Sequence, residues 1–220
     1  MTQRIFALAL AALAMMAQAS AAEPVAKEGE TYQTLPVPQP TETGSRIEVL
    51  EAFSYGCVHC FNFEPALRDW KQRAPADVQV VLLPATFQPL FKLFASGFYA
   101  ARALGVAEKT HEEVFDTVWT QGFQVQNEEQ LVELYAKLGV KREDFVAALH
   151  SSTVTAAVQA ATAKAARLKL EGTPSLYVDG KYQVLLTGAT GFEDIIGRLD
   201  SVVAKARAER KPKRRRLKTP

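Results

Sequence analysis

Residues 47–64 have the sequence Ile47-Glu-Val-Leu-Glu-Ala-Phe-Ser-Tyr-Gly-Cys-Val-His-Cys-Phe-Asn-Phe-Glu64, from which a strand, a turn and a helix are predicted. Its first seven residues are mostly apolar and rich in strand formers, which predicts a buried central strand over 47–53. Ser54-Tyr-Gly56 ends that strand, and a helix is predicted from about Cys57 to Arg73. The apolar face of this helix is expected to consist of Phe61, Leu67 and Trp70.

The sequence after this helix predicts a second strand and then a long helical block. Residues 77–83 are rich in Val and Leu and end at Pro84, so strand, helix and strand form a βαβ unit. Helical periodicity fills 87–171. Within this block, Thr110-His-Glu-Glu113 has the pattern of a capping box that would open one helix, and Asn127 is expected to open another.

The last third of the chain returns to strands and ends in a helix. Residues 175–178 and 181–186 are strand-like, and Asp179-Gly180 between them is a strong hairpin signal. An amphipathic helix is predicted over 192–206. The βαβ half and the ββα half therefore enclose the helical block, which predicts one α/β domain with an all-helical insertion.

The N-terminus has the pattern of an export signal. Arg4 precedes an unbroken apolar run from Ile5 to Met16, and small residues follow in Ala17-Gln-Ala19 and Ser20-Ala-Ala22. The run of about 12 residues is shorter than the roughly 20 that a membrane-spanning helix needs, although a short membrane anchor is an alternative. We therefore predict a signal peptide over 1–22 and an exported protein.

Charge is distributed unevenly along the chain. The formal net charge is +2, but Lys205 to Pro220 contains nine Lys or Arg residues and one acid, Glu209. With Arg4 in the N-terminal segment also set aside, 23–204 has a net charge of −7. Three interpretations of the basic tail stay open: a solvated extension, weak docking to an anionic membrane surface, and nucleic-acid binding. An exported protein meets little nucleic acid, so no nucleic-acid partner is expected.

The chain has two cysteines, Cys57 and Cys60, in the spacing C-x-x-C. A disulfide that encloses two residues constrains the unfolded chain little, so the pair is better explained by chemistry than by stabilisation. Free backbone N–H groups and the helix dipole at Cys57 favour its thiolate, which is the attacking species. An imidazole at His59 would stabilise that thiolate further and make the disulfide more oxidising.

The cysteine pair has other interpretations. Haem attachment requires C-x-x-C-H, but position 61 is Phe. A structural zinc site needs four ligands, and the two other histidines, His111 and His150, fall in predicted helices away from the motif, so no metal is expected. We take those two histidines as ordinary helix residues. An inert structural disulfide remains an alternative.

The stretch Val49 to Glu64 resembles the active-site segment of the DsbA family of periplasmic thiol:disulfide oxidoreductases. Gly172-Thr-Pro-Ser-Leu-Tyr-Val-Asp-Gly-Lys-Tyr182 is similar to the cis-proline loop and hairpin of that family. The resemblance extends over about 30–208 and implies a thioredoxin-like fold. The segments would be a signal peptide (1–22), a first thioredoxin-like half (23–86), the helical insertion (87–171), a second thioredoxin-like half (172–208) and a basic tail (209–220), which we expect to be disordered.

The resemblance also implies roles for individual residues. Cys57 would be the exposed nucleophile and Cys60 its buried partner. A cis Pro174, with Thr173 facing the disulfide, would present a backbone edge to an extended substrate.

The resemblance implies roles for further residues near the cysteines, and at two positions this sequence departs from the family pattern. Glu51 and Glu64 would influence proton movement at the cysteines, and His59 would tune them. Val58 and Thr173 replace a proline and a branched apolar residue that are common in the family.

The activity implied is that of a protein dithiol oxidase without a cofactor. It would donate the Cys57–Cys60 disulfide to reduced, newly exported proteins in the periplasm, and a membrane partner similar to the quinone-linked DsbB would reoxidise it. Two alternatives are a disulfide isomerase or reductase of the same superfamily and a non-enzymatic binding module. A DsbC-like isomerase would need a dimerisation domain, and the 24 residues of 23–46 are too few for one. Thr173-Pro174 also occurs in isomerases of the DsbC and DsbG type.

Overall fold

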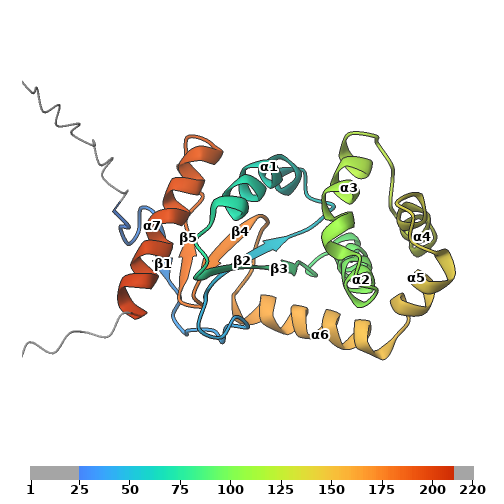
Figure 1. Cartoon of the computed structure of the whole chain (residues 1–220), viewed down its shortest axis with the longest axis horizontal. Helices are drawn as coiled ribbons and strands as arrows, with labels where there is room; N and C mark the ends of the chain where they lie inside the picture. Colours follow the sequence, from blue (N-terminus) through green and yellow to red (C-terminus); the bar gives the residue numbers. More distant parts are fainter. Residues whose placement is uncertain (1–24, 211–220) are drawn as a thin grey trace, which may run out of the picture.

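The computed structural model describes residues 25–210 (Figure 1). The predicted signal peptide and residues 211–220 of the predicted tail lie outside the described residues. Between residues 25 and 210, no helix combines the length and the apolar character that crossing a membrane requires.

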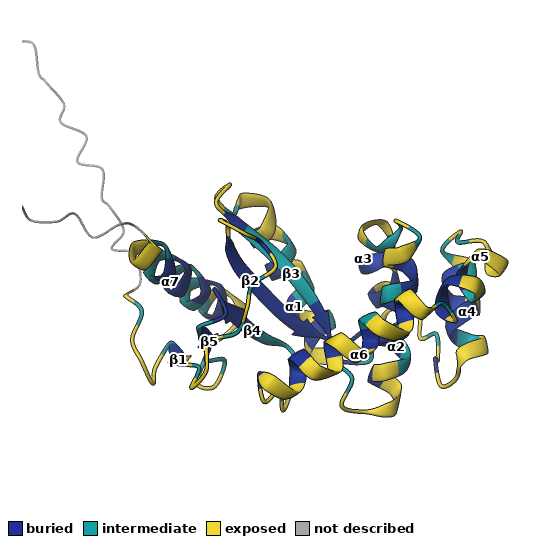
Figure 2. Cartoon of the chain, turned by 90° about the horizontal axis from the view of Figure 1, so that it is seen from below, coloured by how far each residue is buried: buried dark blue, intermediate teal, exposed yellow. Residues whose placement is uncertain are grey.

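Five strands form one mixed sheet in the order β1-β5-β4-β2-β3. The central strand β2 runs parallel to β3 and antiparallel to β4. All seven residues of β2 are buried, as their apolar sequence predicts (Figure 2). The strands are β1 (Tyr32–Thr34), β2 (Ile47–Phe53), β3 (Val78–Pro84), β4 (Ser175–Val178) and β5 (Tyr182–Val184).

Helices cover both faces of the sheet because side chains of β2 alternate between the faces. Ile47 and Val49 pack in one core cluster with helices α1 (Val58–Arg73) and α7 (Phe192–Arg210). Leu50 and Ala52 point the other way and pack with residues of α6. Glu51, between Leu50 and Ala52, therefore lies on the face that α1 covers.

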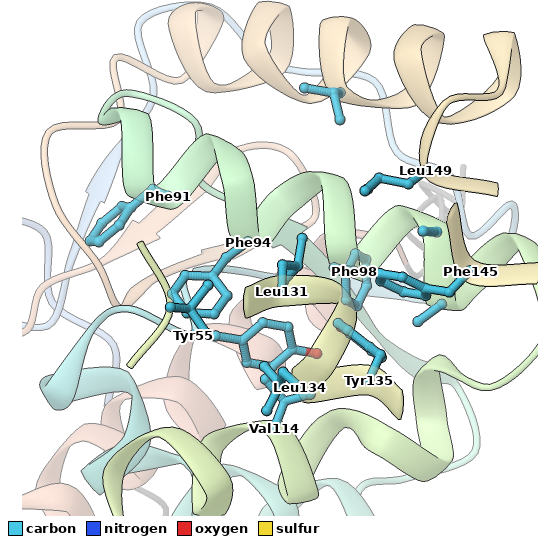
Figure 3. Packing of buried hydrophobic residues seen from close by; sticks show 14 of the residues in the cluster. Tyr55, Phe91, Phe94, Phe98, Val114, Leu131, Leu134, Tyr135, Phe145 and Leu149 are labelled. Carbon is cyan, nitrogen blue, oxygen red and sulfur yellow. The ribbon is translucent and has the colours of Figure 1, made fainter. Parts of the chain in front are cut away.

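Five helices form the insertion between β3 and β4, on the right in Figure 1. Their core is aromatic and aliphatic, and it includes the ring of Tyr55 from the loop after β2 (Figure 3). The βαβ and ββα halves with an all-helical insertion confirm the predicted fold class. The helices are α2 (Pro89–Ala103), α3 (Ala107–Trp119), α4 (Glu128–Lys137), α5 (Arg142–Leu149) and α6 (Ser152–Arg167).

Two local predictions in the helices are wrong. Thr110 does not cap a helix, because α3 already begins at Ala107 and the Thr110 hydroxyl donates to the Val106 carbonyl inside it. Phe61 is only half-buried, whereas Phe63 is fully buried in the core between α1 and the sheet. Phe61 instead faces the helical insertion, whose presence beside α1 the local sequence does not reveal. By contrast, Asn127 caps α4 as predicted and accepts a hydrogen bond from the Gln130 N–H.

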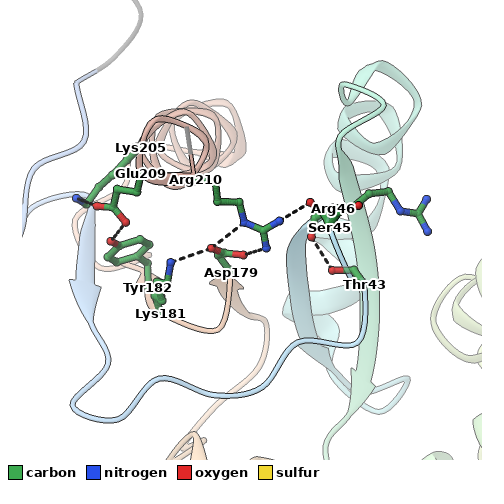
Figure 4. Close-up of polar contacts among 9 residues, drawn as sticks. All are labelled: Thr43, Ser45, Arg46, Asp179, Lys181, Tyr182, Lys205, Glu209 and Arg210. Atoms are coloured by element: carbon green, nitrogen blue, oxygen red, sulfur yellow. Dashed lines mark hydrogen bonds and ion pairs between the residues drawn. The ribbon is translucent and has the colours of Figure 1, made fainter. Parts of the chain in front are cut away.

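The β4–β5 hairpin turns at Asp179-Gly180, as predicted, and both residues have positive φ. Helix α7 ends against this hairpin, where Arg210 pairs with Asp179 and Glu209 accepts a hydrogen bond from the Tyr182 hydroxyl at 2.6 Å (Figure 4). Glu209 and Arg210 therefore belong to the last helix and not to the tail, which corrects the predicted boundary by two residues.

Candidate active site

Cys57 and Cys60 meet at the N-terminus of α1, directly after the central strand. Cys57 is the N-cap residue, and its Sγ accepts a hydrogen bond from the Cys60 N–H at 3.3 Å. Both cysteines are free thiols in the structure. Cys57 retains 8% of its surface, whereas Cys60 is fully buried. Only one sulfur of the pair is thus open to another protein.

The surroundings of the two thiols give them very different pKa values. The pKa of Cys57 is lowered to about 5, first by the hydrogen bond from the Cys60 thiol and then by Thr173 and the backbone N–H groups of Cys60 and His59, against the opposing effect of burial. Burial raises the pKa of Cys60, and the neighbouring Cys57 raises it further. At neutral pH the site therefore holds one thiolate and one thiol.

The loop before β4 closes the site from the second half of the domain. The Thr173-Pro174 peptide bond is cis, and the Cys57 Sγ lies 3.3 Å from the Thr173 carbonyl oxygen. Both observations confirm the predicted geometry of this loop. The chain thus brings together two segments that lie 116 residues apart.

Two carboxylates lie beneath the cysteines. Glu51 on β2 is 1% exposed, and both of its oxygens lack a hydrogen-bond partner among the described residues. Burial raises the pKa of Glu51 well above its usual range, and the charges of Glu64 and Cys57 act in the same direction. The side chain of Glu64 on α1 is 14% exposed and lies 3.4 Å from His111 Nε2. Neither carboxylate is thus a freely solvated surface group.

Glu51, Glu64 and His111 line one cavity of about 610 Å³, which is bounded by α1, α3 and strand β3. No group of three or more His, Cys, Asp or Glu side chains within residues 25–210 is arranged to hold a metal ion. The polar side chains that line this cavity can exchange protons and form hydrogen bonds.

The outer surface of the site is partly apolar. Val58 is 39% exposed beside Cys57, and His59 is exposed next to it. Phe87 is 43% exposed and contacts Phe91 at a ring-centroid distance of 5.2 Å. Phe61 is half-buried, and Phe63, Phe91, Phe94 and Phe98 are core residues, so Phe87 is the exposed one of these six phenylalanines.

Three residues at the site were not predicted to take part in it: Tyr55, His111 and Trp119. His111 was expected to be an ordinary helix residue away from the cysteines, but it is 8% exposed and its Nδ1 lies 2.9 Å from the Tyr55 hydroxyl. Trp119 Nε1 donates to the Tyr55 carbonyl at 2.8 Å. The spacing of His111, Phe115 and Trp119 at four-residue intervals is the sequence signal that could have placed them on one helix face.

Comparison with known proteins gives concordant results. A family model described as "DSBA-like thioredoxin domain" matches residues 48–200. The thiol:disulfide interchange protein DsbA of Pseudomonas aeruginosa is 31% identical over 183 residues, which cover 83% of this chain and 87% of that protein. The corresponding protein of Pseudomonas syringae pv. tomato is 31% identical over 96% of this chain and 99% of its own length.

Solved structures agree with the sequence relatives. The crystal structure of the oxidoreductase DsbA from Xylella fastidiosa superposes with a TM-score of 0.77 and 35% identity, covering 84% of this chain and 99% of that one. The crystal structure of Pseudomonas aeruginosa DsbA gives a TM-score of 0.78 and 31% identity, over 84% of this chain and 96% of that one. The similarity therefore includes both halves of the sheet and the helical insertion.

Proposed function

Because this chain belongs to the DSBA-like thioredoxin domain family, we propose that Cys57 and Cys60 carry the disulfide that it donates to reduced, newly exported proteins. The chain is a protein disulfide oxidase. The observation that supports the assignment to these two residues is their difference in acidity: a stabilised thiolate at the accessible Cys57 and a buried, protonated Cys60.

The reaction has two exchange steps. A substrate thiolate attacks Cys57 Sγ, the Cys57–Cys60 bond breaks, and the Cys60 sulfur leaves with the electron pair and takes up a proton. A second substrate thiolate then attacks the substrate sulfur of the mixed disulfide and releases the Cys57 thiolate. The substrate loses two electrons and forms a disulfide, while the enzyme gains them as a dithiol. A stabilised Cys57 thiolate favours this direction because it is a good leaving group.

Glu51 and Glu64 are proposed to assist the proton transfer to Cys60. Cys60 is buried, so its sulfur cannot take a proton directly from bulk water. Because Glu51 is buried, it stays protonated to a higher pH than an ordinary glutamate. Glu51 also lies close enough to Cys60 for its charge to raise the pKa of the Cys60 thiol. Glu64 lines the same cavity as Glu51, and the charge of Glu64 favours the protonated form of Glu51.

Thr173, Pro174 and Val58 are proposed to bind the substrate. The Thr173 carbonyl reaches Cys57 Sγ, so a substrate cysteine bonded to Cys57 would lie against the same loop. An extended substrate segment could pair with that backbone edge. Val58 follows Cys57 in the chain, is exposed, and could contact an apolar substrate side chain.

The proposed function is tested by oxidation of a reduced secreted protein that has a single disulfide. The oxidised chain is mixed with this substrate, and free thiols are counted on both proteins over time. We expect one substrate disulfide to form for each Cys57–Cys60 disulfide that is consumed. Loss of substrate thiols without a matching gain of thiols on Cys57 and Cys60 would contradict the proposal.

His59 is expected to tune the active-site disulfide. Replacing it with Ala should raise the pKa of Cys57 and make the disulfide less oxidising, because a donor or positive charge beside the thiolate is lost while the backbone N–H stays. The measurement is equilibration with glutathione, with the exposed Asn62→Ala as the control on the same helix. An unchanged potential would show that the His59 side chain has no role in the tuning.

Two partners follow from the proposed reaction: reduced exported proteins and a DsbB-type reoxidant in the membrane. Both would be met in the periplasm, where we place the chain on the basis of its predicted signal peptide. The basic tail is proposed to bring the enzyme to the anionic membrane surface on which such a reoxidant lies. Each basic residue near an anionic surface contributes roughly 1 kcal/mol at best, so the docking would be loose and sensitive to salt.

The tail is tested by sedimentation with anionic liposomes. The full chain is compared with one that stops after Arg210, so that the contacts of Glu209 and Arg210 with the hairpin are kept and six Lys or Arg residues are removed. We expect more sedimentation of the full chain at low salt and little difference at high salt. Equal sedimentation at low salt would reject membrane docking by the tail.

A further inference from the structure

Tyr55 links the redox loop to the helical insertion. It lies two residues before Cys57, in the loop between β2 and α1, and is 1% exposed. Its ring is packed among residues of the insertion, including Phe94 and Val114 (Figure 3). Tyr55 is therefore held by residues of the insertion that lie some 40 or more positions later in the chain.

One face of α3 binds Tyr55 at three points. Trp119 Nε1 donates to the Tyr55 carbonyl at 2.8 Å. The Tyr55 hydroxyl lies 2.9 Å from His111 Nδ1, at hydrogen-bond distance. Between these two contacts, the Phe115 ring meets the Tyr55 ring edge-on at a centroid distance of 4.9 Å. The main chain and the side chain of Tyr55 are thus both fixed by residues at successive turns of a single helix.

The same face of α3 also holds α1, on the other side of the cysteines. Phe61 stacks on Trp119 with a ring-centroid distance of 6.3 Å and an interplanar angle of 22°. Glu64 Oε2 lies 3.4 Å from His111 Nε2. Trp119 and His111 each contact both the loop before Cys57 and helix α1 after it. Cys57 therefore lies between two segments that both pack against α3.

We propose that His111 and Trp119 are positioning residues, which hold Cys57 against the donors that stabilise its thiolate. The inference rests on the proposed role of Cys57 as the reactive sulfur. Apart from Thr173, the groups that stabilise the Cys57 thiolate belong to the first turn of α1, including the Cys60 N–H, which donates to Cys57 Sγ at 3.3 Å. A hydrogen bond weakens steeply with distance and angle, so small displacements of the loop from α1 reduce this stabilisation. Donors that are already in place need no rearrangement when the thiolate forms.

Trp119→Phe is the first test, because it keeps an aromatic ring for Phe61 and removes the hydrogen bond to the Tyr55 carbonyl. His111→Leu removes the hydrogen-bond partner that His111 offers to the Tyr55 hydroxyl, and His111→Asn restores a hydrogen-bonding side chain near the position of Nδ1. We expect Trp119→Phe and His111→Leu each to raise the pKa of Cys57 by about half to one unit. The equilibrium constant with glutathione should shift about 3- to 10-fold towards a weaker oxidant, and His111→Asn should recover most of the change.

The chain offers a matched control for each variant. Trp70 is the only other tryptophan, and its Nε1 donates to Asp200 at 2.6 Å, between α1 and α7. His150 is exposed on the insertion, and its Nε2 lies 2.8 Å from Glu128. Trp70→Phe and His150→Leu remove the same kinds of contact away from the cysteines, so they should leave the pKa of Cys57 and the glutathione equilibrium unchanged, even where they lower the melting temperature.

The outcomes separate this inference from the proposed function. If Trp119→Phe and His111→Leu fold and keep the wild-type pKa of Cys57 and the wild-type glutathione equilibrium, the positioning role is wrong and the function stands. Shifts of equal size in Trp70→Phe and His150→Leu would also reject it, because general loosening would then explain the effect. If the pKa of Cys57 is not lowered in the wild-type chain, the proposed role of Cys57 itself fails.

Discussion

Replacing Cys57 with serine is expected to abolish disulfide donation completely. The chain has two cysteines, so the variant can store no oxidising equivalent, and the remaining sulfur of Cys60 is fully buried and protonated. Cys60→Ser should also donate no disulfide, but it retains the accessible Cys57 thiolate. We therefore expect the two variants to behave alike as oxidases and differently as nucleophiles.

The difference is measured by incubation with oxidised glutathione and mass spectrometry. Cys60→Ser should gain one glutathione at Cys57 and keep it, because no neighbouring thiol remains to resolve the mixed disulfide. Cys57→Ser should gain little or none under the same conditions. Modification of Cys57→Ser as fast as Cys60→Ser would show that Cys60 is the attacking residue and would overturn the assigned roles.

Glu51→Gln is expected to stabilise the protein at neutral pH and much less in acid. In the unfolded chain Glu51 ionises near its ordinary pKa of about 4.3, whereas burial raises its pKa in the folded state. The folded state therefore binds the proton more tightly, and the stability that this binding provides is lost as pH rises above the unfolded value. Glutamine carries no ionisable proton and avoids this loss, so the free energy of unfolding of Glu51→Gln should exceed that of the wild type at pH 7 and approach it in acid.

The measurement is urea unfolding of both chains at about pH 4 and pH 7. Glu48→Gln is the matched control, because Glu48 lies on the same strand and is 2% exposed, but it accepts a hydrogen bond from the Glu42 N–H at 2.6 Å and lies 3.7 Å from Lys164 Nζ. Glu48→Gln should lower the free energy of unfolding. A Glu51→Gln chain with the same gain or loss at both pH values would contradict the account of Glu51 as a buried, proton-binding carboxyl.

Much of the fold follows from local sequence because local and global preferences agree. The apolar run of 47–53 predicts β2, which is buried along its whole length, and Asp179-Gly180 predicts the hairpin. Cys57 and Cys60 could also be identified from the sequence, since the C-x-x-C spacing places both at the start of one helix.

The contacts between the sheet domain and the insertion could not be predicted in the same way. Thr110 fits a capping box, but α3 starts earlier, so this threonine is buried within the helix. His111 lies next in the chain and is an unexceptional helix residue until α3 packs against α1 and brings it to Tyr55 and Glu64. Phe61 likewise stacks on Trp119, which belongs to a helix that is distant in sequence. These positions depend on tertiary packing, which a single helical pattern does not encode.

The N-terminus of α1 holds Cys57 as a thiolate, and titration of the reduced chain tests this without any substrate. The ultraviolet absorbance of the thiolate is followed against pH, with the Cys57→Ser chain as the blank. We expect a transition of one thiol with a midpoint of about 5, and no second transition near neutral pH, because Cys60 stays protonated. A single transition near the unperturbed thiol value of about 8.5 would contradict it.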